Sequence, residues 1–218
     1  MASSSAITQV LETDIWVKAT WEEFLAFADD STWEKGKFYY YQEHMRVEMS
    51  PVGPLHGHQH SILSSVVSLF ATFKNIRFVQ FINASFRKAG ISEFQPYIAC
   101  YIGSNLKLPP NDSNSPVDLN ECDPPNLVIE VGASSFNDDL GSKRLLYEDA
   151  GISEYWVDRA NTQEVFAFAI NDGGSGRIQQ SRVLPGLEIA LVEEALNRSQ
   201  TQDDGEIARW LIQTFNQG

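Results

Sequence analysis

The stretch "NLVIEVG", residues 126–132, places the strongest constraint on how this chain can fold. Val, Ile and Leu form a short apolar run between "DPP" and "GASS", which is typical of a strand that is covered on both faces of a sheet. Glu130 lies in the middle of this run. Because an ionised carboxylate is very costly to bury without a partner, the sequence predicts a cation beside Glu130, either a side chain or a metal ion.

The segment after this strand offers a side chain that could be the cation. "DDLGSKRLLYEDAG" predicts a helix that begins near Asp138 and ends at Gly151. Its apolar stripe consists of Leu140, Lys143, Tyr147 and Ala150. Lys143 therefore faces the sheet and could meet Glu130. The alternative is a lysine with a buried stem and an ammonium that reaches solvent.

The other patterns alternate between helices and strands. "TWEE" is a capping box that predicts a helix from Trp21 to about Ala28, and "KFYYY" and "MRVEMS" predict an antiparallel hairpin. A loop rich in Pro, Gly and His is expected next, and then a long amphipathic helix over 62–73. Further strands are predicted in "RFVQFI", "ASFRKA", "QPYIACYI", "EYWVD" and "EVFAFAI", followed by helices over 191–198 and 205–215. This order predicts an α/β (α+β) fold with a mixed β-sheet flanked by helices.

Length and composition bound the class of protein. A chain of 218 residues with 43% hydrophobic content predicts one domain over 1–218, with residues 1–15 as a flexible N-terminus. No segment is apolar for long enough to span a membrane, and the N-terminal sequence lacks the pattern of a signal peptide. Cys100 and Cys122 show no metal-like spacing. We therefore expect a cytoplasmic protein with no membrane partner.

The charge pattern bears on nucleic acid as a partner. A net charge of −13 argues against non-specific binding to nucleic acid, because such binding depends largely on Lys and Arg. Residues 51–111 are the exception, since they contain five basic residues and a single acid, Glu93. Arg87 and Lys88 in this segment are candidate phosphate contacts, although a solvated strand edge explains them equally well.

Four long segments resemble the Uma-two family of bacterial proteins assigned as endonucleases. They are "YYYQEHMRVEMSPVGPLHGHQHSIL", "FRKAGISEFQPYIACYIG", "PPNLVIEVGASSFNDDLGSKRLLYEDAGISEYWVD" and "VLPGLEIALVEEAL". The resemblance covers nearly the whole chain after about Trp16. It implies a restriction-endonuclease-like core of the PD-(D/E)XK superfamily and hydrolysis of phosphodiester bonds in DNA with Mg²⁺ or Mn²⁺. Carboxylates would hold the ion, which activates a water molecule, and a lysine would stabilise the developing negative charge.

The resemblance assigns roles to particular residues of this chain. Glu130 matches the strand acid, which is catalytic and a metal ligand, and Lys143 matches a catalytic lysine that has moved onto the following helix. Gly132 stands where the usual fold has that lysine. Tyr97, in "QPY", replaces the second metal-binding aspartate, so the ion is expected to be held weakly if it binds at all. Glu48 could supply another carboxylate, or could be an exposed strand acid.

The candidate substrate-binding residues are His56, Arg87, Lys88, Gln95 and Tyr97. His56 and His60 are also spaced like a helical metal pair, but the H-E-x-x-H arrangement is absent and the segment is expected to be a loop, so zinc is disfavoured. "DGGSG" is typical of a hairpin turn, and Tyr155 and Trp156 of a buried strand.

Two functions stay open at this point. The first is a metal-dependent DNA endonuclease. The second is a catalytically inactive nuclease-fold protein that binds nucleic acid or a protein partner, with Tyr97 filling the former metal pocket. A homodimer also stays open, because nucleases that cut both strands commonly dimerise.

Overall fold

The computed structural model describes residues 12–33, 36–49, 53–110, 112–132, 135–172 and 174–216. Of the segment predicted to be flexible, residues 1–11 lie outside these ranges. None of the described helices combines the length and the apolar character that crossing a membrane requires.

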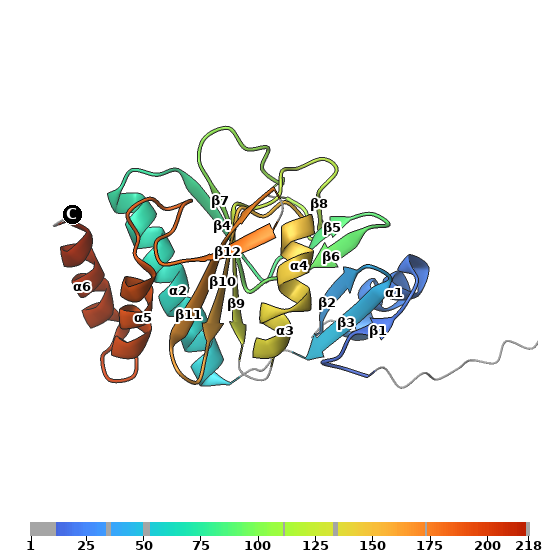
Figure 1. The fold of residues 1–218 in the computed structure, drawn as a ribbon, viewed down its shortest axis with the longest axis horizontal. Helices are drawn as coiled ribbons and strands as arrows, with labels where there is room; N and C mark the ends of the chain where they lie inside the picture. Colours follow the sequence, from blue (N-terminus) through green and yellow to red (C-terminus); the bar gives the residue numbers. More distant parts are fainter. Residues whose placement is uncertain are drawn as a thin grey trace, which may run out of the picture.

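The strands form two mixed sheets of six strands each (Figure 1). The central sheet consists of β4 (Phe78–Ile82), β7 (Ile98–Ile102), β9 (Leu127–Gly132), β10 (Glu154–Arg159), β11 (Glu164–Asn171) and β12 (Gly174–Ile178). Its order is β12-β11-β10-β9-β7-β4, and only β9 and β10 run parallel within it.

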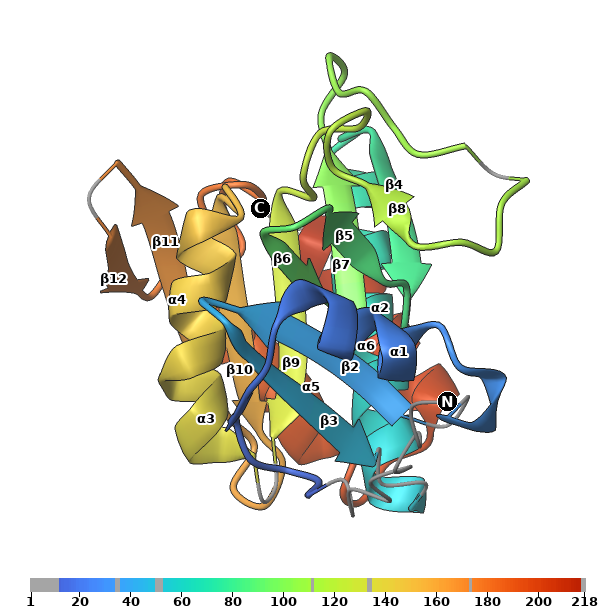
Figure 2. The ribbon, with the colours of Figure 1, turned by 90° about the vertical axis from the view of Figure 1, so that its right-hand side faces the viewer.

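The second sheet, called here the hairpin sheet, lies beside the central one. It consists of β1 (Val17–Lys18), β2 (Gly36–Tyr41), β3 (His44–Met49), β5 (Phe86–Lys88), β6 (Ser92–Phe94) and β8 (Val117–Asp118). Its order is β1-β3-β2-β6-β5-β8, with β5 and β8 parallel. Figure 2 shows its β2–β3 hairpin crossing in front of the central sheet.

Five of the described helices cover the two faces of the central sheet, and the first helix packs against the hairpin sheet (Figure 1). The helices are α1 (Trp21–Ala28), α2 (Pro54–Phe73), α3 (Phe136–Leu140), α4 (Ser142–Asp149), α5 (Ile189–Arg198) and α6 (Asp204–Asn216), with a 3₁₀ turn at Ser31–Trp33. Helices α2, α5 and α6 lie on one face, whereas α3 and α4 lie on the other, on the same side as the hairpin sheet (Figure 1).

Side chains of β9 alternate between two buried faces, which explains why its residues other than Glu130 are apolar. Leu127, Ile129 and Val131 belong to the core that packs against α2, α5 and α6, whereas Val128 belongs to the core beneath α4 and the hairpin sheet. Glu130 shares the face of Val128, since successive side chains of a strand point to opposite sides. The carboxylate therefore enters the layer between the two sheets.

The hairpin follows the same rule, and this brings polar side chains to the site. Its apolar face packs against Phe24 of α1 and consists of Phe38, Tyr40, Met45 and Val47. Its other face, toward the central sheet, carries Lys37, Tyr39, Arg46 and Glu48. The hairpin thus presents two cations, a phenol and a carboxylate to the layer that holds Glu130.

The fold class predicted from the sequence is confirmed, as are the first helix with its capping box and the hairpin. Tyr155 and Trp156 are buried as expected, and β11 pairs with β12 around the predicted turn, whose Gly173 lies outside the described residues. The strands β1, β6 and β8 were not foreseen.

Two helix predictions were wrong in detail. The segment before Ile62 is not a loop, because α2 begins at Pro54, a residue that suits the first turn of a helix. The helix predicted from Asp138 is instead two helices separated at Gly141, whose φ of −105° and ψ of −106° are not helical. A Cβ there would lie 3.1 Å from the Asn137 carbonyl oxygen, so the sharp bend favours glycine.

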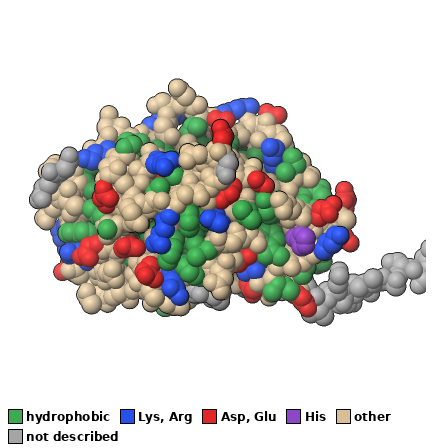
Figure 3. Space-filling view, in the orientation of Figure 1, with side chains coloured by type: hydrophobic (Ala, Val, Ile, Leu, Met, Phe, Trp, Pro, Cys, Tyr) green, Lys and Arg blue, Asp and Glu red, His purple; other side chains and the backbone are tan. Residues whose placement is uncertain are grey.

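Charged side chains of both signs are mixed on the face that Figure 3 draws, where acidic and basic groups alternate with apolar ones. Contact with phosphate groups on this face would therefore depend on a few local cations and not on a wide basic area.

Candidate active site

Glu130 is fully buried between the two sheets. Its Oε1 accepts hydrogen bonds from the hydroxyl of Tyr147 in α4 at 2.6 Å and from that of Tyr39 in β2 at 3.1 Å. Its Oε2 has no hydrogen-bond partner among the described residues. One carboxylate oxygen is therefore fixed by two phenols, and the other is left to a further donor or a cation.

Lys143 is the cation that the sequence predicted beside Glu130. Its side chain is 1% exposed, and its Nζ lies 2.8 Å from Glu48 Oε1, 2.9 Å from Asp139 Oδ1 and 3.8 Å from Glu130 Oε1. Burial lowers the pKa of Lys143, but Glu130, Asp139 and Glu48 together raise it above its usual value. The solvent-reaching alternative for this lysine is wrong.

Glu48 is buried rather than an exposed strand acid, so that alternative is wrong as well. Arg46 Nε lies 2.8 Å from Glu48 Oε1 and 3.3 Å from Asp138 Oδ2. Burial raises the pKa of Glu48, but Lys143 and Arg46 outweigh it, so the pKa lies below the usual value. The Trp16 indole donates to Asp138 Oδ1 at 2.6 Å and fixes the outer end of this network.

Four carboxylates, Glu48, Glu130, Asp138 and Asp139, form what we call the acidic cluster. Oxygens of Glu48, Asp138 and Asp139 lie within 4.8 Å of one another, which is the spacing of a metal site. Burial raises the pKa of Asp139 to about 6 although Lys143 lowers it. The cluster is thus a set of oxygen donors whose negative charge is partly compensated by Lys143 and Arg46.

Gly132 has a steric role next to this cluster. A Cβ at this position would lie 2.4 Å from Asp139 Oδ2, closer than real side chains come, and 3.1 Å from the Phe136 Cα, which is a tight contact. The Ser135 hydroxyl donates to the same Asp139 oxygen at 2.8 Å. Asp139 therefore occupies the space that a lysine at position 132 would need, which explains why the ammonium comes from α4.

Tyr97 lies directly before β7 and is largely buried. Lys37 places its ammonium 2.8 Å from the centre of the Tyr97 ring. The rings of His56 and His60 lie 4.8 Å and 4.2 Å from the same ring. Burial and Lys37 lower the pKa of His56, and burial with His56 lowers that of His60 to about 3. His56 is thus placed on the helix side of Tyr97, beside the predicted site.

The other candidate substrate contacts lie farther along the hairpin sheet. Arg87 is ion-paired with Glu93 and, at 2.7 Å, with Asp29, and Lys88 is half-buried at the end of β5. Arg87 is therefore already engaged by two carboxylates. The roles of both residues in binding substrate stay predictions.

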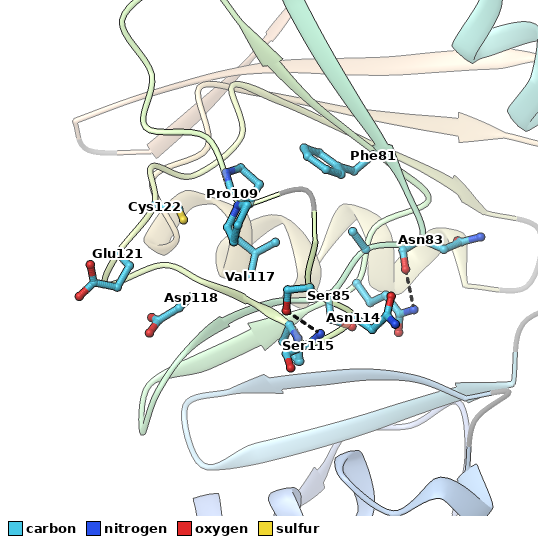
Figure 4. A pocket seen from close by; sticks show the side chains of 15 residues that line it. Phe81, Asn83, Ser85, Pro109, Asn114, Ser115, Val117, Asp118, Glu121 and Cys122 are labelled. Carbon is cyan, nitrogen blue, oxygen red and sulfur yellow. Dashed lines mark hydrogen bonds between the residues drawn. The ribbon is translucent and has the colours of Figure 1, made fainter.

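Gln95 connects the site to a cavity of about 560 Å³ (Figure 4). Its backbone carbonyl oxygen lies 3.0 Å from the Tyr39 hydroxyl, so the single proton of this hydroxyl is shared between Gln95 and Glu130. Its side chain donates to the Asn83 carbonyl at 3.0 Å, and the cavity is further lined by Phe81 and Asn114. Gln95 thus lies between the acidic cluster and this cavity, while its contact with substrate stays a prediction.

Sequence reasoning missed Lys37, Tyr39, Arg46 and Asp139. The signal was present for three of them, because polar residues two apart in "KFYYY" and "MRVEM" must share one face of a hairpin that already contained Glu48. For Asp139, the signal was its position four residues before Lys143.

Comparisons with known proteins identify the family and support the fold. The family model described as "Uma2: Putative restriction endonuclease" matches residues 21–208. A solved structure described as a putative nuclease belonging to DUF820, from Anabaena variabilis ATCC 29413, is similar with a TM-score of 0.54 and 18% sequence identity. The match covers 81% of this chain and 98% of that one. No curated protein matches the sequence.

Proposed function

The chain belongs to the Uma2 family of restriction-endonuclease-like proteins, and from this premise we propose that it is a divalent-metal-dependent endonuclease that hydrolyses phosphodiester bonds in DNA. The observation that carries the proposal is the position of Lys143, whose ammonium is enclosed by Glu48, Glu130 and Asp139. Perturbed ionisable groups of this kind, buried on facing elements, are frequent in catalytic sites.

The acidic cluster contains donors that suit Mg²⁺ or Mn²⁺. Both ions prefer carboxylate oxygens, and Glu130 Oε2 is a buried carboxylate oxygen without a hydrogen-bond partner among the described residues. Glu130 and Glu48 would hold the ion. When bound, it would supply the polarisation of the phosphate and the lowered pKa of an attacking water molecule. Binding is expected to be weak because Tyr97 stands where the resemblance places a second metal-binding aspartate.

The protein's own side chains would orient the reacting groups. Tyr39 and Tyr147 donate to one oxygen of Glu130, so its other oxygen keeps a fixed direction. Lys143 would stabilise negative charge on the phosphoryl oxygens, since its raised pKa keeps it protonated. His56, Arg87, Lys88, Gln95 and Tyr97 are the proposed substrate contacts. We place this activity in the cytoplasm, where the free thiols of Cys100 and Cys122 stay reduced.

The test is a plasmid-nicking assay with Mg²⁺ or Mn²⁺. Glu130→Gln is the informative variant, because the amide oxygen can still accept from both tyrosines while the negative charge is lost. Glu164→Gln, which changes an exposed acid at the start of β11, is the matched control. We expect nicking by the native protein and the control and its loss in Glu130→Gln. Nicking by Glu130→Gln at the native rate would refute the assigned role of this carboxylate.

A second candidate is an inactive nuclease-fold protein that binds nucleic acid or a protein partner. The contact between Lys37 and Tyr97 favours it, because a neutral phenol and an ammonium stand where a metal-binding aspartate is expected. Binding of labelled DNA, measured by fluorescence anisotropy without any nicking under the same ionic conditions, would support this candidate against the first.

A further inference from the structure

Lys37 is a buried cation with an unusual setting. Its side chain projects from β2 into the layer between the sheets and is 3% exposed. Its ammonium lies over the Tyr97 ring, and its Nζ has no hydrogen-bond partner among the described residues. A ring face attracts a desolvated cation but does not replace the hydrogen bonds that water would give it.

The carboxylate of Glu130 lies in the same region, and one of its oxygens, the buried Oε2, also has no hydrogen-bond partner among the described residues. The printed pairing of β7 with β9 ends at Ile98 and Ile129, and Tyr97 and Glu130 are each the next residue along the chain beyond that pair. Burial lowers the pKa of Lys37 to about 7, and Glu130 is the carboxylate that opposes this shift most strongly. Lys37 forms no direct ion pair with Glu130 among the described residues, so the two groups act on each other across the layer between the sheets.

The position of Lys37 is held from several sides. Lys37 lies opposite Glu48 in the backbone register of the hairpin, and the Glu48 carboxylate is fixed by Lys143 and Arg46. On the opposite side, His56 and His60 pack against the Tyr97 ring and restrict its movement away from the ammonium. With Lys37, Arg46 and Lys143 all present, the four carboxylates of the acidic cluster meet three side-chain cations.

We propose that Lys37 is a tethered cation that takes the place of a divalent ion beside Glu130 and Tyr97, so that Lys37 limits the affinity of this chain for Mg²⁺ or Mn²⁺. The inference rests on the proposed function only in using Glu130 as the ligand of that ion. An ammonium held near the carboxylates that would bind the ion repels a divalent cation, so Lys37 would have to move away or lose its proton before the metal ion could bind.

The test is calorimetric titration of MnCl₂ into the full chain and into variants. Lys37→Met removes the charge and keeps an unbranched stem, so the Mn²⁺ dissociation constant is expected to fall by at least about tenfold. Lys37→Met combined with Glu130→Gln is expected to lose this gain. The matched control is Lys107→Met, which removes an exposed lysine far from the cluster in sequence and should leave Mn²⁺ binding as in the native protein. Equal Mn²⁺ affinities for native protein and folded Lys37→Met would overturn the proposal.

Tyr97→Asp provides a second measurement that does not depend on the folding of Lys37→Met. The new carboxylate should pair with the Lys37 ammonium, so the Mn²⁺ affinity of this variant is expected to stay within about twofold of native. The combination with Lys37→Met should bind Mn²⁺ most tightly of all. A tenfold gain from Tyr97→Asp alone would show that the ammonium does not compete with the ion, and would overturn the proposal.

The outcomes also separate this inference from the proposed function. If the native protein nicks DNA with Mg²⁺ while Lys37→Met leaves Mn²⁺ affinity unchanged, the tethered cation is refuted and the nuclease stands. If Lys37→Met tightens Mn²⁺ binding and neither protein nicks DNA, the inference stands and the nuclease proposal fails.

Discussion

Replacing Lys143 with methionine tests whether the buried charges are as closely linked as the distances indicate. Without the ammonium, Asp139 and Glu130 lose the cation that lies 2.9 Å and 3.8 Å from them, whereas Glu48 keeps Arg46. Removing one partner of a buried ion pair costs about 3–5 kcal/mol, because an uncompensated charge stays in the interior. For a chain of this length, we expect the melting temperature to fall by about 10 °C.

The same variant should gain a pH dependence whose sign follows from Asp139. Burial already raises the pKa of Asp139 to about 6, and losing Lys143 would raise it further above the unfolded value. A carboxyl whose folded-state pKa is raised stabilises the protein below its unfolded pKa, and that stability is lost as the pH rises through the folded-state pKa. The deficit of Lys143→Met should therefore be larger at about pH 8 than at about pH 5.

Thermal unfolding followed by circular dichroism measures both effects. Lys107→Met is the matched control, since its side chain is 65% exposed and lies 3.4 Å from Glu121 at the surface, and its melting temperature should match that of the native protein. Adding Asp139→Asn to Lys143→Met should recover part of the loss, because it removes one of the uncompensated charges. A Lys143→Met protein that melts within about 2 °C of native at both pH values would refute the reasoning.

Three further predictions concern single contacts. Gly132→Ala should destabilise the protein by about 1–3 kcal/mol in urea unfolding, because its Cβ would meet Asp139, whereas Gly57→Ala, with open space in α2, should stabilise it. Tyr147→Phe should cost about 1–3 kcal/mol by removing a donor to buried Glu130, and Tyr41→Phe, which loses a similar bond to Asp149 at the surface, should cost less. Asp158 is buried and its pKa is raised to about 7 by desolvation, so its contribution to stability falls as the pH rises from about 4 to about 7. Asp158→Asn should flatten that part of the stability profile, and an unchanged slope in denaturant titrations across it would contradict the assignment.

The centre of the site could be predicted from the sequence because its two main residues are constrained locally. An acid inside an apolar strand needs a partner, and the stripe that contains Lys143 and Tyr147 had to face the sheet. Both residues contact Glu130, although the helix that carries them is interrupted at Gly141. The break at Gly141 did not change the burial of these two residues, because α4 still turns the side that carries Lys143 and Tyr147 toward the sheet.

The hairpin's contribution was harder to predict, because it depends on how two sheets pack. Alternation assigns Lys37, Tyr39 and Arg46 to the face of Glu48, but it does not say which of the two faces meets the central sheet. The contacts that decide this join residues 91 and 95 positions apart, from Tyr39 to Glu130 and from Glu48 to Lys143. The sequence alone therefore left Glu48 undecided between an exposed acid and a ligand.

The side chain of Tyr97 does not follow the alternation of side chains along β7. Continued back from Ala99 and Tyr101, which belong to the core beneath the hairpin sheet, alternation would point Tyr97 to that same side. Its ring instead belongs to the core beneath α2, beside His56 and His60, while Lys37 reaches it from the hairpin. Tyr97 precedes the first residue of β7, so the strand geometry does not yet hold it. Tyr97, which stands where the resemblance places a metal-binding aspartate, thus lies at the end of a strand, where alternation no longer predicts the direction of a side chain.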